Sequence, residues 1–279
     1  MTEVKAPEYL YHYTTIDTLH HMFKKNESGK SFVEFRFTDY RFLNDAEEGT
    51  FFKKYMEKQS KKFKESLSSE TRILFDEAVE RVQSLLAGDN EYFYVMSFSE
   101  LEDSMQFWRQ DYAKNKGICL KINTSKMEGM KNEKKYPISS FVKVKYLRLN
   151  DGIESSFPEL KNKLEKCAAN IKSGVKTFEF YKYENWFELF PYDVKNFVWK
   201  SEEEWRLQIP DAKTPSRNVF HEIDDEGIPR AKIRIDNPFE EIILGPTFSR
   251  HYVGSIEKWL SDRGFDNVTV RCGEGVLNR

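Results

Sequence analysis

The residues best suited to chemistry lie in a short acidic run, Trp-x-x-Glu-x-Glu-Trp-Arg, near the start of the last third of the chain. If this segment is a strand, Glu202, Glu204 and Arg206 point to one face and Trp205 points to the other. Two carboxylates and a guanidinium are costly to bury unless they are paired, and they suit a cleft that binds a polar ligand. A salt-bridged edge strand anchored by its tryptophan is the structural alternative.

Three further clusters carry residue types that could contribute to a site. They are Tyr11, His12, Tyr13 and Thr14; Asn44 and Asp45; and Ser97 and Ser99 together with Trp108 and Tyr112. Each cluster also has an ordinary structural explanation, because aromatic runs often hold a core histidine, Asn-Asp often caps a helix, and aromatics one helical turn apart usually pack inward.

No familiar catalytic or nucleotide-binding signature occurs, whether GxSxG, GxxxxGK[ST], GxGxxG or HExxH. The adjacent pair His20 and His21 would diverge by about 100° on a helix and is poorly placed to chelate one ion. We therefore expect no metal site. The alternative that remains is a nucleic-acid enzyme that holds Mg²⁺ between Asp45, Glu202 and Glu204.

The composition indicates a protein without a strong global attraction to nucleic acid or to an anionic membrane. The 279 residues include 44 basic and 46 acidic side chains, for a net charge of −2. No stretch approaches the roughly 18 apolar residues of a membrane span, and the N-terminus lacks the apolar core of a signal peptide. Cys119, Cys167 and Cys272 are scattered and fit no metal-ligand spacing, which favours a reducing, cytoplasmic location.

The pattern of apolar residues predicts a single α+β domain over residues 1–279, with a mixed or antiparallel central sheet flanked by helices. Strands are expected at 9–14, 31–38, 92–98, 117–122, 141–147, around Glu204, and at 231–235, 240–244 and 267–271. Helices are expected at 15–23, 47–63, 71–86, 103–112 and 249–260, with helical insertions around 45–88 and 157–196. In the strand at 31–38, Arg36 should lie on the face opposite Phe35.

The four clusters, taken in order, resemble the mostly bacterial family catalogued as domain of unknown function 2971. That family opens with Leu-Tyr-x-Tyr-[Thr/Ser] and continues with Asn-Asp-Pro-x-Glu, where this chain has alanine in place of proline. A Ser-Phe-Ser-Glu stretch, the Glu-x-Glu-Trp-Arg strand and a Leu-Gly-Pro strand end follow. The matching segments here are 10–14, 44–48, 97–100, 202–206 and 244–246, so the resemblance spans nearly the whole chain.

The opening Tyr-His-Tyr-Thr strand and the helix after it are also similar to the start of ADP-ribosyltransferases. This resemblance implies that His12 and Thr14 orient NAD and that Trp108 or Tyr112 stacks on the nicotinamide. It also implies a possible ADP-ribosyltransferase-like fold. The other members of the clusters would line the ligand site: Tyr11, Tyr13, Asn44, Asp45, Ser97 and Ser99.

The same resemblance assigns roles to the acidic strand. Glu204 would hold the ribose and stabilise an oxocarbenium-like transition state, and Glu202 would position or deprotonate the acceptor. Arg206 or Arg36 would neutralise the pyrophosphate, because a guanidinium binds phosphate oxygens in pairs.

Two functions follow as expectations. The first is an ADP-ribosyltransferase-like enzyme that uses NAD as its substrate, acting as a phage-defence or toxin effector. The second is a sensor module of a defence system that binds a small nucleotide ligand or a protein partner without chemistry. In both cases we expect no membrane contact and no metal.

Overall fold

The computed structural model describes residues 5–43, 48–87, 93–109, 117–132, 138–139, 141–175, 193–210 and 219–274. The chain divides into two compact units. The first comprises Met1–Glu3, Tyr40–Phe93 and Val144–Ser201; the second comprises Val4–Asp39, Tyr94–Lys143 and Glu202–Arg279. The segments expected as helical insertions fall within the first unit, and the single domain stays a prediction.

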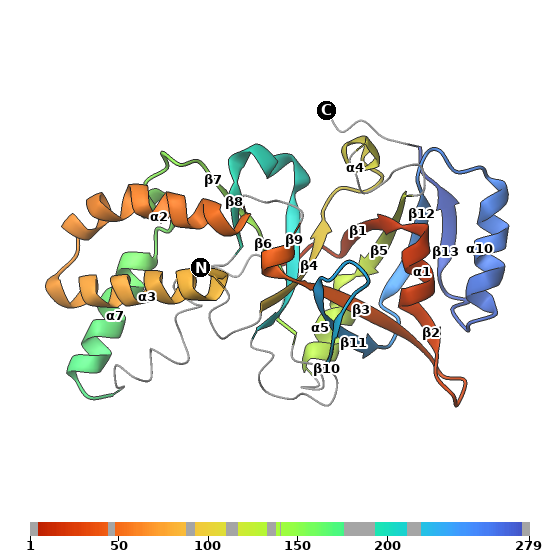
Figure 1. Ribbon diagram of the computed structural model, residues 1–279, viewed down its shortest axis with the longest axis horizontal. Helices are drawn as coiled ribbons and strands as arrows, with labels where there is room; N and C mark the ends of the chain where they lie inside the picture. The colour runs from red at the N-terminus through yellow and green to blue at the C-terminus, as the bar shows by residue number, and fades with distance from the viewer. Residues whose placement is uncertain are drawn as a thin grey trace. The chain divides into compact units, whose positions relative to one another are not determined.

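The first unit is mainly helical (Figure 1). Its elements are η1 (Tyr40–Phe42), α2 (Glu48–Glu65), α3 (Ser69–Ala87), β7 (Lys145–Leu147), α6 (Ile153–Ser156), α7 (Leu160–Lys172), β8 (Val194–Asn196) and most of η2 (Phe197–Glu202). Aromatic rings join the helices: Phe63 lies 5.1 Å from Phe75, and Tyr55 lies 6.3 Å from Phe157. The helices expected at 47–63 and 71–86 are therefore confirmed as α2 and α3.

The second unit is built on a sheet with eleven strands among the described residues. They are β1 (Tyr9–Thr15), β2 (Phe23–Lys25), β3 (Ser31–Asp39), β4 (Phe93–Ser99), β5 (Gly117–Asn123), β6 (Val142–Lys143), β9 (Glu204–Pro210), β10 (Val219–Ile223), β11 (Pro229–Ile235), β12 (Phe239–Leu244) and β13 (Thr269–Cys272). The order is β10-β11-β3-β4-β1-β5-β12-β13, with β2 beside β3, β9 beside β4, and β6 beside β9. The α+β class with a mixed, mostly antiparallel sheet is confirmed, and an ADP-ribosyltransferase-like arrangement stays a prediction.

One apolar core explains why these strands form. Val33, Phe35 and Phe37 alternate along β3 and are fully buried, whereas Arg36 lies on the opposite face, as the pattern predicted. The Phe35 ring lies 5.4 Å from the ring of Phe239 on β12, a strand that is not its neighbour in the sheet. The sheet therefore curves around a shared core, and β3 and β12 pack against each other across it.

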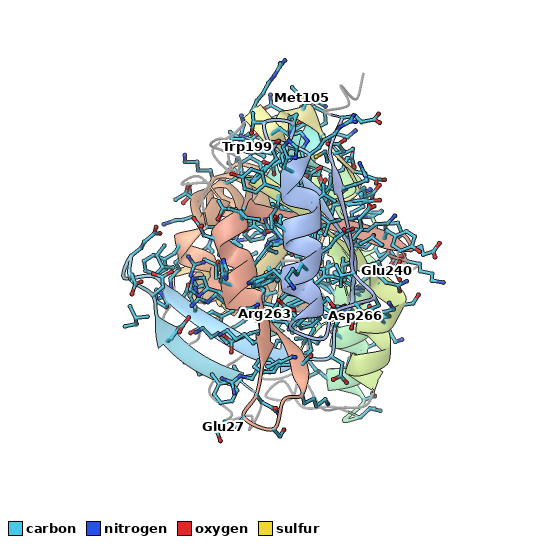
Figure 2. The ribbon with its side chains drawn as sticks, turned by 90° about the vertical axis from the view of Figure 1, so that its right-hand side faces the viewer. Glu27, Met105, Trp199, Glu240, Arg263 and Asp266 are labelled. Carbon is cyan, nitrogen blue, oxygen red and sulfur yellow. The ribbon has the colours of Figure 1, made fainter. Side chains whose placement is uncertain are left out.

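Three helices complete this core: α1 (Ile16–Met22), α5 (Thr124–Asn132) and α10 (His251–Ser261). They contribute Leu19, Met22, Met127, Ile256 and Leu260. Figure 2 looks onto α10, with Arg263 labelled just beyond its C-terminal end. None of the helices in the described part of the chain combines the length and the apolar character that a membrane span requires.

Several strands differ from the sequence-based expectation. β2 was not predicted, because Phe23 was assigned to the helix at 15–23, and β8 lies in a segment that was expected to be helical. The strand predicted at 141–147 is two short strands, because β6 pairs with β9 whereas β7 pairs with β8 in the other unit. β10 was not predicted at all, because Phe220 and Ile223 are exposed and the segment lacks an alternating apolar face.

Gly245 provides a test of the packing at the end of β12. A Cβ atom there would lie 2.9 Å from the Gly117 carbonyl oxygen and 3.2 Å from the Trp108 ring. We expect Gly245→Ala to lower the free energy of unfolding by about 1–3 kcal/mol in urea denaturation, because backbone cannot move aside as a flexible side chain can. Gly129→Ala, at an exposed position of α5 where nothing lies within 4 Å of the added Cβ, should instead raise the free energy of unfolding by about 0.5–1 kcal/mol. A Gly245→Ala protein as stable as the wild type would contradict the close approach.

Candidate functional site

The acidic strand β9 carries a buried ion pair on the side away from the core. Arg206 donates from Nε to Glu204 Oε1 over 2.7 Å and from Nη2 to Oε2 over 3.2 Å. Glu204 is only 5% exposed and Arg206 1%. Trp205 lies in the core on the other side of the strand, so the predicted alternation of these three residues is confirmed. The two-point contact fixes the guanidinium plane against the carboxylate.

Glu202 does not belong to this alternation, contrary to the sequence-based expectation. It ends the 3₁₀ helix η2, and Glu203 after it has a φ of 43°. A left-handed residue interrupts the pleat, so the strand pattern begins only at Glu204. The Glu203 carboxylate instead points toward Lys143, whose Nζ lies 3.4 Å from Oε2. Glu203 and Glu204, although adjacent in sequence, therefore have different cationic partners.

The end of β4 holds this acidic turn in place. Ser99 Oγ donates to the Glu202 carbonyl over 2.7 Å and accepts the Leu101 N–H over 3.0 Å. The Glu100 N–H donates to the Glu203 carbonyl over 3.2 Å. Ser99 therefore lies beside Glu202, at the turn that precedes β9, and its hydroxyl binds the backbone of that turn.

A half-buried cluster beside the turn includes residues that the sequence analysis did not assign to a site. Glu100 Oε1 accepts hydrogen bonds from Lys143 Nζ and from Trp205 Nε1, each over 2.7 Å. Burial opposes ionisation of Glu100, but these two donors outweigh it and lower its pKa. Glu100 could have been found from the Ser-Phe-Ser-Glu motif. The sequence did not single out Lys143, because it follows other lysines and lies about 60 residues before Glu203 in the chain.

The two tyrosines of β1 face away from the main core and anchor the loop that follows β4. Tyr11 donates its hydroxyl to Glu102 Oε2 over 3.0 Å. Tyr13 donates to the Leu101 carbonyl over 2.6 Å and accepts the Ser104 N–H over 2.9 Å. Burial is the main cause that raises the pKa of both phenols. These contacts give both tyrosines a loop-holding role, and their part in ligand binding stays a prediction.

Trp108 lies against the same tyrosines, on the short helix α4 (Met105–Arg109). Its ring makes an edge contact with Tyr13 at 5.2 Å, and its Nε1 donates to Asp103 Oδ1 over 2.7 Å. Asp103 has a φ of 50°, and its Oδ2 accepts the Glu274 N–H over 2.5 Å. Trp108 is thus held by a strained, fully engaged aspartate.

His12 lies on the opposite side of β1 from the tyrosines. It pairs with Leu120 in the ladder and shares its side with Leu10 of the core. Its Nδ1 lies 2.8 Å from the Ser97 carbonyl, which can only accept, so Nδ1 carries the proton. Burial lowers the pKa of His12, and the hydrogen bond to the Ser97 carbonyl opposes this shift only in part. The lowered pKa favours the neutral ring. Glu204 lies on the side away from the core, so the structure does not place these two residues on one face.

The remaining predicted residues are dispersed. Thr14 Oγ1 lies 2.8 Å from the hydroxyl of Thr18 on α1, and Arg36 contacts Glu222 on β10 rather than the β9 carboxylates. Ser97 contributes its carbonyl to His12. Asn44, Asp45 and Tyr112 lie outside the described residues. Among the residues that are described, no three His, Cys, Asp or Glu side chains converge as a metal site would need.

Residues 107–207 match the family model described as "Protein of unknown function (DUF2971)". This DUF2971 domain occupies just over a third of the chain and includes Trp108, Lys143 and the Glu204–Arg206 pair. The chain matches no curated protein. It also matches no solved structure. The comparisons therefore identify the domain and lend no support to a likeness with ADP-ribosyltransferases.

The Glu204–Arg206 pair should be strongly coupled. We expect Glu204→Gln to lower the free energy of unfolding by about 3 kcal/mol, because it leaves a buried guanidinium without its carboxylate. A double-mutant cycle with Arg206→Met, measured by urea denaturation, should give a coupling energy above about 1 kcal/mol. The matched cycle of Glu203→Gln with Lys143→Met, on a half-exposed pair, should stay below about 1 kcal/mol. Equal couplings would contradict the difference in burial.

His12 should make stability depend on pH. Its pKa is lower in the folded than in the unfolded protein, so the folded state binds fewer protons. The stabilisation is fully present above the unfolded pKa of about 6.5 and is lost as the pH falls below it, by up to about 1.4 kcal/mol per pH unit. Denaturation between pH 7.5 and 5.0 should show this slope in the wild type and lose it in His12→Asn. The control, His251→Asn at an exposed helix position, should keep the slope.

Proposed function

We propose that this protein binds a small nucleotide-type ligand, with NAD as the first candidate, beside the acidic turn at the start of β9. The observation that supports this most is the left-handed Glu203 placed directly between the buried carboxylates of Glu202 and Glu204. A non-glycine residue in this conformation costs about 1–2 kcal/mol. Such strain is most often retained where a site needs it.

The electrostatics of the turn support the same proposal. A buried carboxylate–guanidinium pair is seldom more stable than apolar side chains of equal volume, so its retention favours a role in recognition. Arg206 carries a guanidinium, a group that suits phosphate oxygens, and Glu204 holds its Nε and Nη2 and so fixes its plane. In this reading the protein is a ligand-binding module, and a protein partner is its alternative occupant.

A second candidate function is ADP-ribosyl transfer, in a toxin or phage-defence effector. It is favoured by the neutral His12 ring, whose Nδ1 is held by the Ser97 carbonyl, so that Nε2 is an acceptor for a ribose hydroxyl. Glu204 would then stabilise the oxocarbenium-like transition state. This function requires His12 and Glu204 to reach one NAD molecule from different sides of their strands, which makes binding without chemistry the better-supported proposal.

NAD titration tests the proposal directly. At about 100 times its dissociation constant, NAD should raise the melting temperature of the wild type by about 5 °C. The shift should vanish in Glu204→Gln and persist in the half-exposed control Glu203→Gln, each compared with its own ligand-free protein. The proposal fails if NAD changes neither the melting temperature nor the heat of titration of the wild type.

Nicotinamide release, followed by chromatography, separates the two candidates. A module binds NAD without releasing nicotinamide. If the protein is an enzyme, the wild type releases nicotinamide and is more toxic on expression than Glu204→Gln. His12→Asn then loses the release but keeps the thermal shift with NAD.

A further inference from the structure

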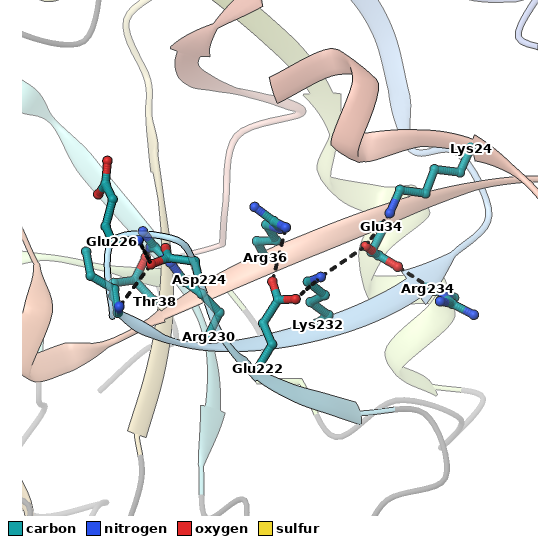
Figure 3. A network of polar contacts seen from close by, with 11 residues as sticks. Lys24, Glu34, Arg36, Thr38, Glu222, Asp224, Glu226, Arg230, Lys232 and Arg234 are labelled. Atoms are coloured by element: carbon teal, nitrogen blue, oxygen red, sulfur yellow. Dashed lines mark hydrogen bonds and ion pairs between the residues drawn. The ribbon is translucent and has the colours of Figure 1, made fainter. Parts of the chain in front are cut away.

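A second group of charged residues lies on the side of β3, β11 and β10 that faces away from the core (Figure 3). Ion pairs join four cations, Lys24, Arg36, Lys232 and Arg234, and a fifth cation, Arg230, forms a separate pair with Asp224. The carboxylates between them are only three, those of Glu34, Glu222 and Asp224. The network therefore carries two more positive than negative charges.

Two of these cations oppose each other directly. Arg36 and Lys232 are partners in the ladder between β3 and β11, and like charges at opposed positions destabilise a sheet. Glu222 on β10 relieves this repulsion, because its carboxylate contacts both. Its own ladder partner is Arg230, which is already engaged by Asp224. The Glu222 side chain thus reaches past its neighbour to the cation pair.

Glu222 satisfies this pair incompletely. Arg36 Nη2 lies 3.1 Å from Glu222 Oε1, yet that oxygen makes no well-oriented hydrogen bond with the described residues. Arg36 Nε is likewise buried with no hydrogen-bond partner among them. A guanidinium has five donors arranged to grip two oxygens at once, and the buried Nε donor of Arg36 has no partner among the described residues.

The group is open to exchange with solvent. The side chains of Arg36, Glu222 and Lys232 are 32%, 28% and 15% exposed. Among the described strands β10 pairs with β11 alone, so the Glu222 carboxylate can swing outward without disturbing the core. Glu34 is only 2% exposed and is held by Lys24 and Arg234. Burial opposes its ionisation, but those two donors prevail and lower its pKa, so its charge is already matched by Lys24 and Arg234.

We propose that Arg36 and Lys232 form a binding site for a phosphate-type oxyanion, and that Glu222 occupies this site as an internal competitor when the anion is absent. A phosphate group has enough oxygens to accept from the Arg36 fork and from Lys232 Nζ together, which one carboxylate does only in part. The site is separate from the acidic turn of β9 and does not depend on the function proposed there.

Titration calorimetry with inorganic pyrophosphate, at an ionic strength held constant with NaCl, tests this site. Glu222→Gln removes the competing charge and should tighten pyrophosphate binding about tenfold, whereas Arg36→Gln should weaken it about tenfold. The matched control is Arg234→Gln, which removes the same charge from the same face. It should leave the affinity within about twofold of the wild type, because Arg234 contacts Glu34 and not the cation pair.

Three results would overturn the proposal. Unchanged or weaker binding by Glu222→Gln would leave the network with a structural role only. Equal losses in Arg36→Gln and Arg234→Gln would indicate diffuse attraction rather than a site. If a variant fails to fold, NMR of the wild type provides the test. The Arg36 Nε–H resonance should shift when the protein is saturated with pyrophosphate, and a resonance that does not shift refutes the site.

Discussion

The second unit depends on how β4 shares its two edges among three partner strands. β3 pairs with its start, at Val95 and Tyr94, and β1 pairs with its end, at Ser99, while β9 also pairs with it. Since a strand has only two edges, these partners must divide its length between them. The Ser97 carbonyl, between the two paired stretches, accepts a hydrogen bond from the His12 ring. A neutral histidine is therefore part of the sheet's own hydrogen bonding.

This arrangement separates apolar from charged chemistry. The strands on both sides of β4 turn their apolar faces to one shared core, which Phe35 and Phe239 close from opposite sides. Charged side chains lie on the outward faces. Where they are buried there, they are paired or joined in networks, because an unpaired buried charge is costly. Glu204 with Arg206, and Glu34 with its cations, are two deeply buried instances.

The loop after β4 connects these outward faces. Ser99 binds the backbone of the acidic turn. Just after it in the loop, Leu101 is bound by Tyr13 of β1, and Asp103 binds the Trp108 ring. Motifs far apart in sequence, the Tyr-x-Tyr strand, the Ser-Phe-Ser-Glu stretch and the Glu-x-Glu-Trp-Arg strand, are thus joined by direct hydrogen bonds. These contacts give the motifs a structural role of their own, which is why a motif alone does not reveal function.

Much of the fold could be predicted from local patterns. The alternation of Val33, Phe35 and Phe37 predicted both the strand and the outward position of Arg36, and the amphipathic periods predicted α2 and α3. β10 could not be predicted, because a solvated edge strand is specified by its ladder to β11 and not by an apolar face. The clusters also named Ser99 and Glu202, which a hydrogen bond joins, and Glu204 and Arg206, which form an ion pair; their part in one ligand site stays a prediction.

The sequence by itself determined the α+β class, most strands and helices, and the side of β9 on which Glu204 and Arg206 lie, because period-two burial is a local property. Only the tertiary structure decided that Glu202 leaves this strand, since the left-handed turn at Glu203 is held by β4. It alone placed His12 across the sheet from Glu204 and set Glu222 between Arg36 and Lys232. These outcomes depend on strand order and register, which join residues distant in sequence and leave no mark in the local pattern.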